Sequence, residues 1–129
     1  MMPGVSLTQL AAVAAGASMG AWVRWLAGIW LNHKWAGFPL GTLLVNCLGG
    51  LLIGALLLWF ERTPNETLRL LLVTGLLGGL TTFSSYSGES LILLQRGHWA
   101  LAAGHTTAHV LGSLLFAGLG YQIARHLLD

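Results

Sequence analysis

The chain has 129 residues, of which 55% are hydrophobic and only 8% are charged, and its mean hydropathy is +0.73. Soluble domains carry about a quarter charged residues, so the composition excludes an ordinary soluble protein. The sequence also has no nucleotide-binding loop and no nucleophile–base pair that would indicate an enzyme. Its six Lys and Arg residues are spread along the chain and form no patch for nucleic acid. The composition predicts an integral membrane protein.

Four uncharged runs divide the chain, at residues 1–23, 35–60, 70–88 and 97–124. Each run reaches or approaches the roughly 20 residues that a helix needs to cross a bilayer. The runs predict an all-α membrane protein with four transmembrane helices and a single domain over residues 1–129. We expect the helices at about 6–31, 41–60, 66–95 and 99–127, with Asn65 as the cap of the third.

Basic residues are balanced between the two predicted sides of the membrane. The side of the termini carries Arg62, Arg69 and Arg125, and the opposite side carries Arg24, Lys34 and Arg96. Such a balance gives the positive-inside rule almost nothing to act on. We therefore hypothesise that the chain inserts in both directions and that oppositely inserted copies pair as an antiparallel dimer.

The first helix carries Gly16, Gly20, Arg24 and Gly28 at intervals of four, so these residues share one face. Small residues at this spacing allow a second helix to approach closely. Arg24 has two interpretations. It is either an attractive charge at the mouth of an anion path or an arginine that snorkels to the headgroups among the tryptophans at the helix end.

The second helix repeats this pattern with Thr42, Asn46, Gly50 and Gly54. A hydroxyl, an amide and a glycine groove therefore lie along one line. Asn46 can join two helices by a hydrogen bond, or it can offer its NH2 donors to a passing anion. The two roles are compatible, and the pattern favours neither.

The third segment is unusual because Gly75–Ser90 places a glycine pair, six Ser and Thr residues, Tyr86 and Glu89 at membrane depth. Unpaired polar groups in hydrocarbon cost several kcal/mol, so such sequence is tolerated where protein buries it or where it lines an ion path. We expect the helix to break between Gly78 and Ser85, which exposes carbonyl oxygens beside a new helix N-terminus. The alternative is a straight helix whose hydroxyls bond to carbonyls four residues earlier.

The fourth helix carries a polar stripe of Thr106, His109 and Ser113. His105 and His109 are one turn apart, a spacing that metal ligands also use. No carboxylate or cysteine shares the stripe. The sequence therefore favours hydrogen-bonded core histidines over a metal site.

Several motifs together resemble the small fluoride channels of the Fluc or CrcB family. The strongest is Gly78-Gly79-Leu80-Thr81-Thr82-Phe83-Ser84-Ser85-Tyr86-Ser87 followed by Glu89, and it is joined by Arg24-Trp25, by Gly41-Thr42-Leu43-Leu44-Val45-Asn46 and by His109-Val110-Leu111-Gly112-Ser113. The likeness covers the whole chain. It implies a dual-topology homodimer in a bacterial inner membrane, with two pores at the subunit interface that export cytoplasmic fluoride passively.

The resemblance also implies roles for individual residues. The fluoride pore would include Thr42, Asn46, Phe83, Ser84, Tyr86 and Ser113, with Arg24 in the vestibule. The backbone carbonyls of Gly78 and Thr81 would hold a structural Na⁺ on the dimer axis. In two places the chain departs from the family, which commonly has phenylalanine in place of Tyr86 and threonine in place of Ser85. Tyr86 keeps an aromatic edge but adds a hydroxyl that needs a partner.

A proton-coupled exporter of organic cations is the main alternative function. Such a transporter needs a deep carboxylate that binds protons and cations in turn, normally in its first helix. The first predicted helix has no acidic residue, and Glu89 is the only one inside a helical run away from its ends. The pattern therefore favours the channel.

Overall fold

The fold is described from a computed structural model that covers residues 4–35 and 37–129. These residues form helices and turns and no strand. The elements are α1 (Leu7–Leu31), α2 (Leu40–Arg62), α3 (Glu66–Arg69), the π-helical η1 (Leu70–Leu77), α4 (Gly78–Leu80), α5 (Phe83–Gln95) and α6 (Trp99–Leu128).

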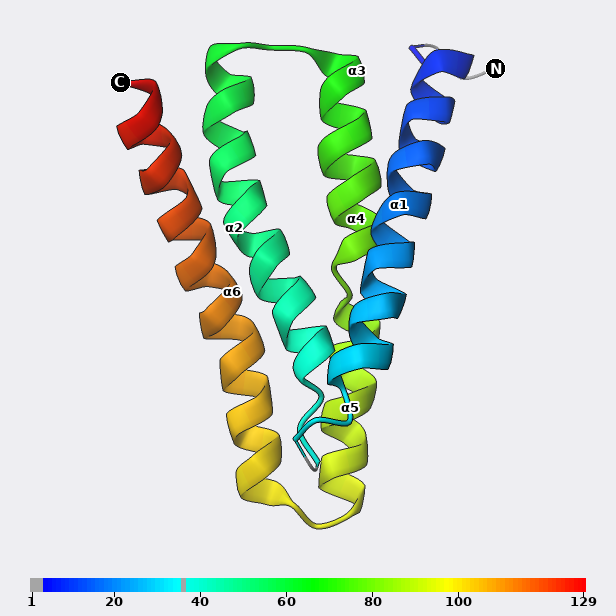
Figure 1. Ribbon diagram of the computed structural model, residues 1–129, viewed down its shortest axis with the longest axis vertical. Coiled ribbons are helices and arrows are strands. Elements are labelled where there is room, and N and C mark those ends of the chain that lie inside the picture. Colours follow the sequence, from blue (N-terminus) through cyan, green and yellow to red (C-terminus); the bar gives the residue numbers. More distant parts are fainter. Residues whose placement is uncertain (1–3, 36) are drawn as a thin grey trace.

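Four segments in the described part of the chain are long and apolar enough to cross a membrane, namely Leu7–Leu31, Leu40–Arg62, Glu66–Gln95 and Trp99–Leu128. Figure 1 shows that they alternate in direction, with both termini and the α2–α3 connection at one end. The protein is thus an all-α, multi-pass membrane protein, as the uncharged runs predict.

Local signals set the helix ends close to the expected positions. Ser6 and Gln9 form a capping box at the start of α1, and the Asn65 side chain accepts a hydrogen bond of 3.0 Å from the Leu68 amide. After α5, Gly97 adopts a φ of 76°, and the His98 amide bonds back to the Leu93 carbonyl at 2.9 Å. This is a Schellman motif, which needs the left-handed conformation that glycine adopts without strain.

Glycines bring the backbones of neighbouring helices into direct contact. A Cβ atom on Gly54 of α2 would lie 2.8 Å from the Ala117 carbonyl carbon of α6, and one on Gly120 would lie 2.8 Å from that of Leu51. On α1, Gly16 and Gly20 approach the backbone of η1 and α4 in the same way. In α1 and α2 the spacing of four predicts these contacts correctly except at Gly28, where a Cβ atom would meet only the Asn32 side chain.

The third transmembrane segment departs from regular helix in two places. In η1 the backbone follows a π-helical path, and the Gly78 amide bonds to the Val73 carbonyl five residues earlier. Beyond α4, Thr81 and Thr82 are extended, with φ and ψ of −86° and 156° and of −149° and 118°. The π-helix was not predicted, because composition does not distinguish it from an α-helix.

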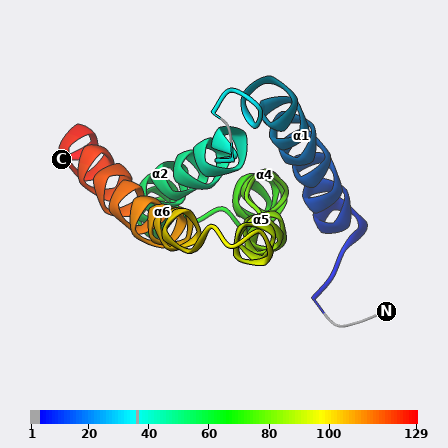
Figure 2. The ribbon, with the colours of Figure 1, turned by 90° about the horizontal axis from the view of Figure 1, so that it is seen from below.

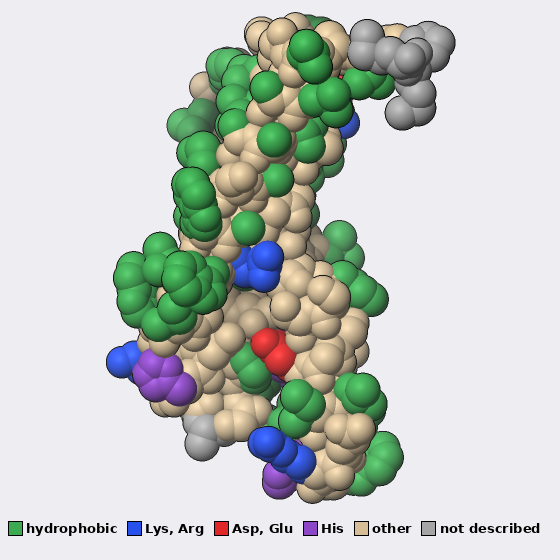
Figure 3. Space-filling view, turned by 90° about the vertical axis from the view of Figure 1, so that its right-hand side faces the viewer, with side chains coloured by type: hydrophobic (Ala, Val, Ile, Leu, Met, Phe, Trp, Pro, Cys, Tyr) green, Lys and Arg blue, Asp and Glu red, His purple; other side chains and the backbone are tan. Residues whose placement is uncertain are grey.

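The helices form two pairs that converge at the end opposite the termini. Figure 1 shows α2 beside α6 and the third segment beside α1, and Figure 2 shows α4 and α5 between the α2–α6 pair and α1. Apolar side chains cover much of the face shown in Figure 3, with few charges among them. Because lipid surrounds the outer faces of a membrane protein, exposed apolar side chains are expected there.

Candidate functional site

The extended stretch at Thr81 and Thr82 is held by a side chain from α2. The Thr82 amide donates to Asn46 Oδ1 at 2.8 Å, and the Thr82 carbonyl accepts from Asn46 Nδ2 at 3.0 Å. Arg24 Nε of α1 donates to the Gly79 carbonyl at 3.0 Å. Two side chains thus replace helical partners that the backbone lacks at this point, which satisfies polar groups that would otherwise be costly.

Asn46 has no unused amide hydrogen in this arrangement. Its Nδ2 atom also lies 3.0 Å from Nδ1 of His109, which must accept because Nδ2 only donates. Thr82 fixes the orientation of the amide, since it offers both a donor and an acceptor. The joining role expected for Asn46 is therefore present, and an anion would have to displace one of these two bonds to reach a donor.

Helix α5 begins inside the protein with its own cap. Thr82 Oγ1 accepts from the Ser85 amide at 3.0 Å and lies 3.4 Å from Ser84 Oγ. Thr81 Oγ1 instead bonds to the Leu77 carbonyl four residues earlier, at 2.8 Å. The first turn of α5 presents amides and hydroxyls at the positive end of a helix dipole, an environment that favours an anion.

A groove of about 620 Å³ runs between the α2–α6 pair and the third segment. Six residues expected at the pore or the cation site line it: Asn46, Gly78, Thr81, Phe83, Tyr86 and Ser113. Its remaining walls are mostly apolar, with His109 and Thr82 among the exceptions. The fold thus gathers residues that lie far apart in the sequence on one open, largely apolar track.

A second hollow of about 350 Å³ contains the other expected positions apart from Ser84. It is lined by Arg24 and Thr42 together with Thr82, Ser85 and Glu89, among others. Thr42 Oγ1 donates to Glu89 Oε2 at 2.6 Å. Ser84 lines neither hollow, and its hydroxyl lies 3.4 Å from that of Thr82.

Comparison with known proteins places the chain in a family. The family model of CrcB-like proteins, described as camphor resistance (CrcB), matches residues 11–121. The chain belongs to the CrcB family. A protein of Aromatoleum aromaticum named fluoride-specific ion channel FluC is 51% identical to it over 123 residues, with 94% of each chain covered. Proteins of the same name from Thiobacillus denitrificans and Bordetella petrii are 45% identical over 94% of this chain and 99% of the relative, and 50% identical over 90% and 91%.

In this CrcB protein, aromatic rings line one side of the groove. Phe83 meets Tyr86 edge to face at 5.2 Å between centroids, and Tyr86 stacks on His109 at 4.7 Å. The Phe83 ring is 78% exposed in the single chain, so its edge is free to face a ligand. A ring edge is the positive part of the aromatic quadrupole and attracts an anion weakly.

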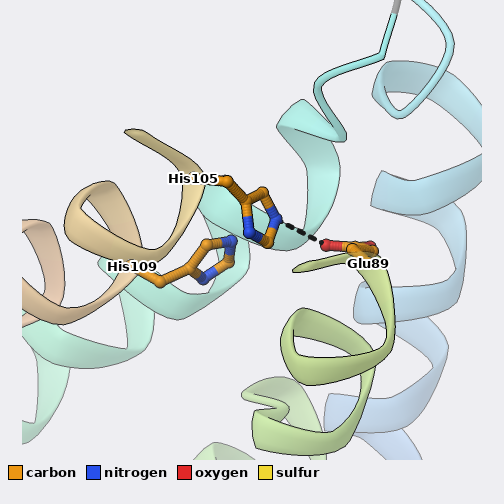
Figure 4. A group of neighbouring side chains, drawn as sticks. All are labelled: Glu89, His105 and His109. Atoms are coloured by element: carbon orange, nitrogen blue, oxygen red, sulfur yellow. Dashed lines mark hydrogen bonds and ion pairs between the residues drawn. The ribbon is translucent and has the colours of Figure 1, made fainter. Parts of the chain in front are cut away.

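A buried polar cluster beneath these rings was not expected from the sequence. Glu89 of α5 reaches His105 of α6, with Oε1 and Nε2 3.1 Å apart (Figure 4). Ser90 Oγ lies 2.7 Å from the other nitrogen of His105. His105 is fully buried. The histidine pair is therefore hydrogen-bonded in the core as expected, but the carboxylate missing from its stripe comes from the neighbouring helix.

Proposed function

We propose that this CrcB protein is a fluoride-selective channel that exports cytoplasmic fluoride passively. The observation that carries the proposal is the near full-length similarity to proteins named as fluoride-specific ion channels. The groove supports it, because it combines a few polar groups with aromatic edges along an otherwise apolar wall. Weak, repeated sites of this kind let an ion enter and leave. The chain is a transport protein and not an enzyme.

The anion path would follow Asn46, Phe83, Tyr86 and Ser113 along the groove, with Ser84 contributing at the first turn of α5. Fluoride would take an amide hydrogen of Asn46 in place of the His109 contact, since both hydrogens are engaged in its absence. Arg24 and Thr42 would act at the entrance, because both line the second hollow. Arg24 would also support the backbone at Gly79.

The groove is open on one side, which supports an assembly of two chains with pores at their interface. Its open wall includes α6 residues with large exposed apolar side chains, such as Val110 at 53% and Leu114 at 68% exposure. We propose an antiparallel homodimer of oppositely inserted chains in a bacterial inner membrane. The even distribution of Lys and Arg between the two ends is consistent with dual insertion.

The interruption of the third segment would serve as the functional break of a transmembrane helix. The Thr82 amide, which would bond to the Gly78 carbonyl in a continuous helix, donates to Asn46 instead. The Gly78 carbonyl is therefore left without that helical donor. Gly78 and Thr81 both line the groove, and their backbone carbonyls fit a structural Na⁺. Such an ion would offset the crowding of carbonyl dipoles where two chains meet.

Gly78 offers a test of the cation site and the dimer together. A Cβ atom at Gly78 would meet only the Val73 carbonyl, at 3.8 Å, so the single chain has room for a side chain. Gly78→Val should therefore damage the dimer while the chain still folds, because the added groups crowd only the partner copy.

Removal of Na⁺ is a second test. Exchange of Na⁺ for a bulky organic cation should also weaken the dimer. An unchanged dimer after verified Na⁺ removal contradicts the cation site.

Anion efflux from liposomes that contain the purified protein tests the function itself. We expect fluoride release without chloride release, and protein-free liposomes provide the baseline. Equal release of the two anions, or none, would contradict the proposal.

Dual insertion can be checked separately. A single cysteine placed at the carboxyl terminus is labelled from each side of the membrane in turn. Labelling from one side only would exclude dual insertion.

A further inference from the structure

Glu89, His105 and His109 form a compact set of potential metal ligands. One ligand atom from each lies within 4.8 Å of the others. Figure 4 shows α5 supplying the carboxylate and α6 both imidazoles, with a ring nitrogen of His109 directed toward His105. His105 and His109 are 0% and 3% exposed, while the Glu89 side chain keeps 18% exposure at the second hollow. The set is buried but can be reached from that hollow.

His109 carries a buried donor without a partner. Its Nδ1 accepts from Asn46, so the neutral ring has its proton on Nε2. Among the described residues nothing bonds to Nε2, which is the one buried side-chain polar atom left unsatisfied. An unpaired buried donor costs about 1–3 kcal/mol. A metal ion bound to Nε2 in place of this proton would remove that cost.

The Glu89–His105 pair already has the spacing of two ligands on one ion. Zinc bonds of about 2.0–2.1 Å in tetrahedral geometry place two ligand atoms roughly 3.3 Å apart, close to the 3.1 Å observed between Oε1 and Nε2. Ser90 Oγ stands 2.7 Å from Nδ1 of His105 and can accept the proton there once Nε2 binds a metal. Thr42 orients the other carboxylate oxygen. Such outer partners are typical of imidazole–metal sites.

We propose that Glu89, His105 and His109 bind a divalent transition-metal ion of the Zn²⁺ class, and that a bound ion reduces fluoride passage. Two imidazoles and a carboxylate suit Zn²⁺, whereas Mg²⁺ and Ca²⁺ prefer oxygen ligands alone. Ligation through Nε2 moves the His109 proton to Nδ1, where it faces the donor hydrogens of Asn46. Their hydrogen bond is then replaced by two donors that face each other, which opposes the orientation of the Asn46 amide that Thr82 fixes. This second step rests on the proposed channel function.

Metal binding is tested directly on the full-length protein purified without a polyhistidine tag. Titration with Zn²⁺, and with Co²⁺ as an absorption probe, should give one ion per chain and the spectrum of a tetrahedral nitrogen–oxygen site. Glu89→Gln and His105→Gln should each weaken binding by at least about tenfold, the scale of losses at metal sites. Matched controls are His98→Gln and His126→Gln, because both histidines are exposed and lie outside the set. Binding that is absent, or that the controls alone reduce, overturns the site.

Two further measurements keep the test decisive if a buried variant fails to fold. Electron paramagnetic resonance of bound Cu²⁺ in the unaltered protein counts nitrogen ligands, and fewer than two imidazoles overturns the site. Fluoride efflux should fall at Zn²⁺ concentrations that fill the site, with wild-type behaviour in His98→Gln. Binding without any fall in efflux overturns the link to Asn46. Fluoride efflux of the metal-free protein tests the channel proposal alone. The channel proposal and the metal-site proposal can therefore be contradicted independently.

Discussion

The contact between α2 and α6 and the surroundings of Thr82 are built on opposite principles. In the first, around Gly54 and Gly120, the two backbones touch without a polar side chain between them. In the second, side chains such as Asn46 and Arg24 bond to backbone groups that the interrupted helix leaves free. The backbones of the first region meet within one chain, whereas the second region lines an open groove and, among the described residues, leaves His109 Nε2 unpaired. Function is expected where the polar network is incomplete.

The largest effect should come from breaking the glycine contact. Gly120→Val should abolish folding of the chain, since its Cβ atom would lie 2.8 Å from the Leu51 carbonyl carbon and backbone atoms cannot move aside. We expect a cost at or above the roughly 1–3 kcal/mol typical of overpacking. Gly118→Val is the matched control on the same helix, because a Cβ atom there meets nothing within 4 Å. Equal yields of monodisperse protein from both variants would contradict the packing account.

Next in size is the effect of removing donors from the polar network. Asn46→Asp keeps an acceptor for the Thr82 amide but loses the hydrogens given to the Thr82 carbonyl and to His109, and it adds a negative charge to the path. Fluoride efflux should fall by at least about 100-fold, or ~2.7 kcal/mol of barrier. Efflux is normalised to the amount of folded dimer in the same sample. Fluoride efflux at the wild-type level would contradict the assignment of Asn46 to the pore.

A smaller effect is expected at the aromatic wall. Phe83→Ile removes the ring edge, and because the side chain is 78% exposed in the single chain, stability should change little. Fluoride efflux should fall about tenfold, since aromatic-edge contacts contribute roughly 0.5–1.5 kcal/mol. Phe116→Ile on α6 is a suitable control, because Phe116 is partly exposed and does not line the groove. Parallel losses of efflux and folded protein would indicate a packing role for Phe83.

The mildest change should be Thr81→Ser. Serine keeps the hydroxyl that donates to the Leu77 carbonyl at 2.8 Å, and the proposed cation ligand is the backbone carbonyl, which does not change. The lost methyl group packs against Gly49, so thermal unfolding should show a loss of about 1 kcal/mol. Fluoride efflux should stay within about twofold of wild type. A large loss of efflux would show that fluoride passage depends on the Thr81 side chain and not only on its backbone carbonyl.

Much of the architecture was predictable because local sequence carries it. Uncharged runs predicted four membrane helices, Asn65 marked the start of the third, and glycines at intervals of four predicted the close contacts of α1 and α2. The residues expected in the pore also followed from motifs, and most of them line the groove. Their roles, the dimer and the sodium site stay predictions.

The sequence by itself determined the class, the number of spans and the polar positions, since hydropathy and residue spacing act along the chain. Only the tertiary structure decided which polar groups meet. Asn46 reaches Thr82, 36 positions away, and Glu89 reaches His105 from another helix, so no stripe on one helix reveals either pair. The π-helix η1, which packs against α1, likewise has no signal in the composition. In an apolar interior each buried polar group must find a partner wherever the fold supplies one.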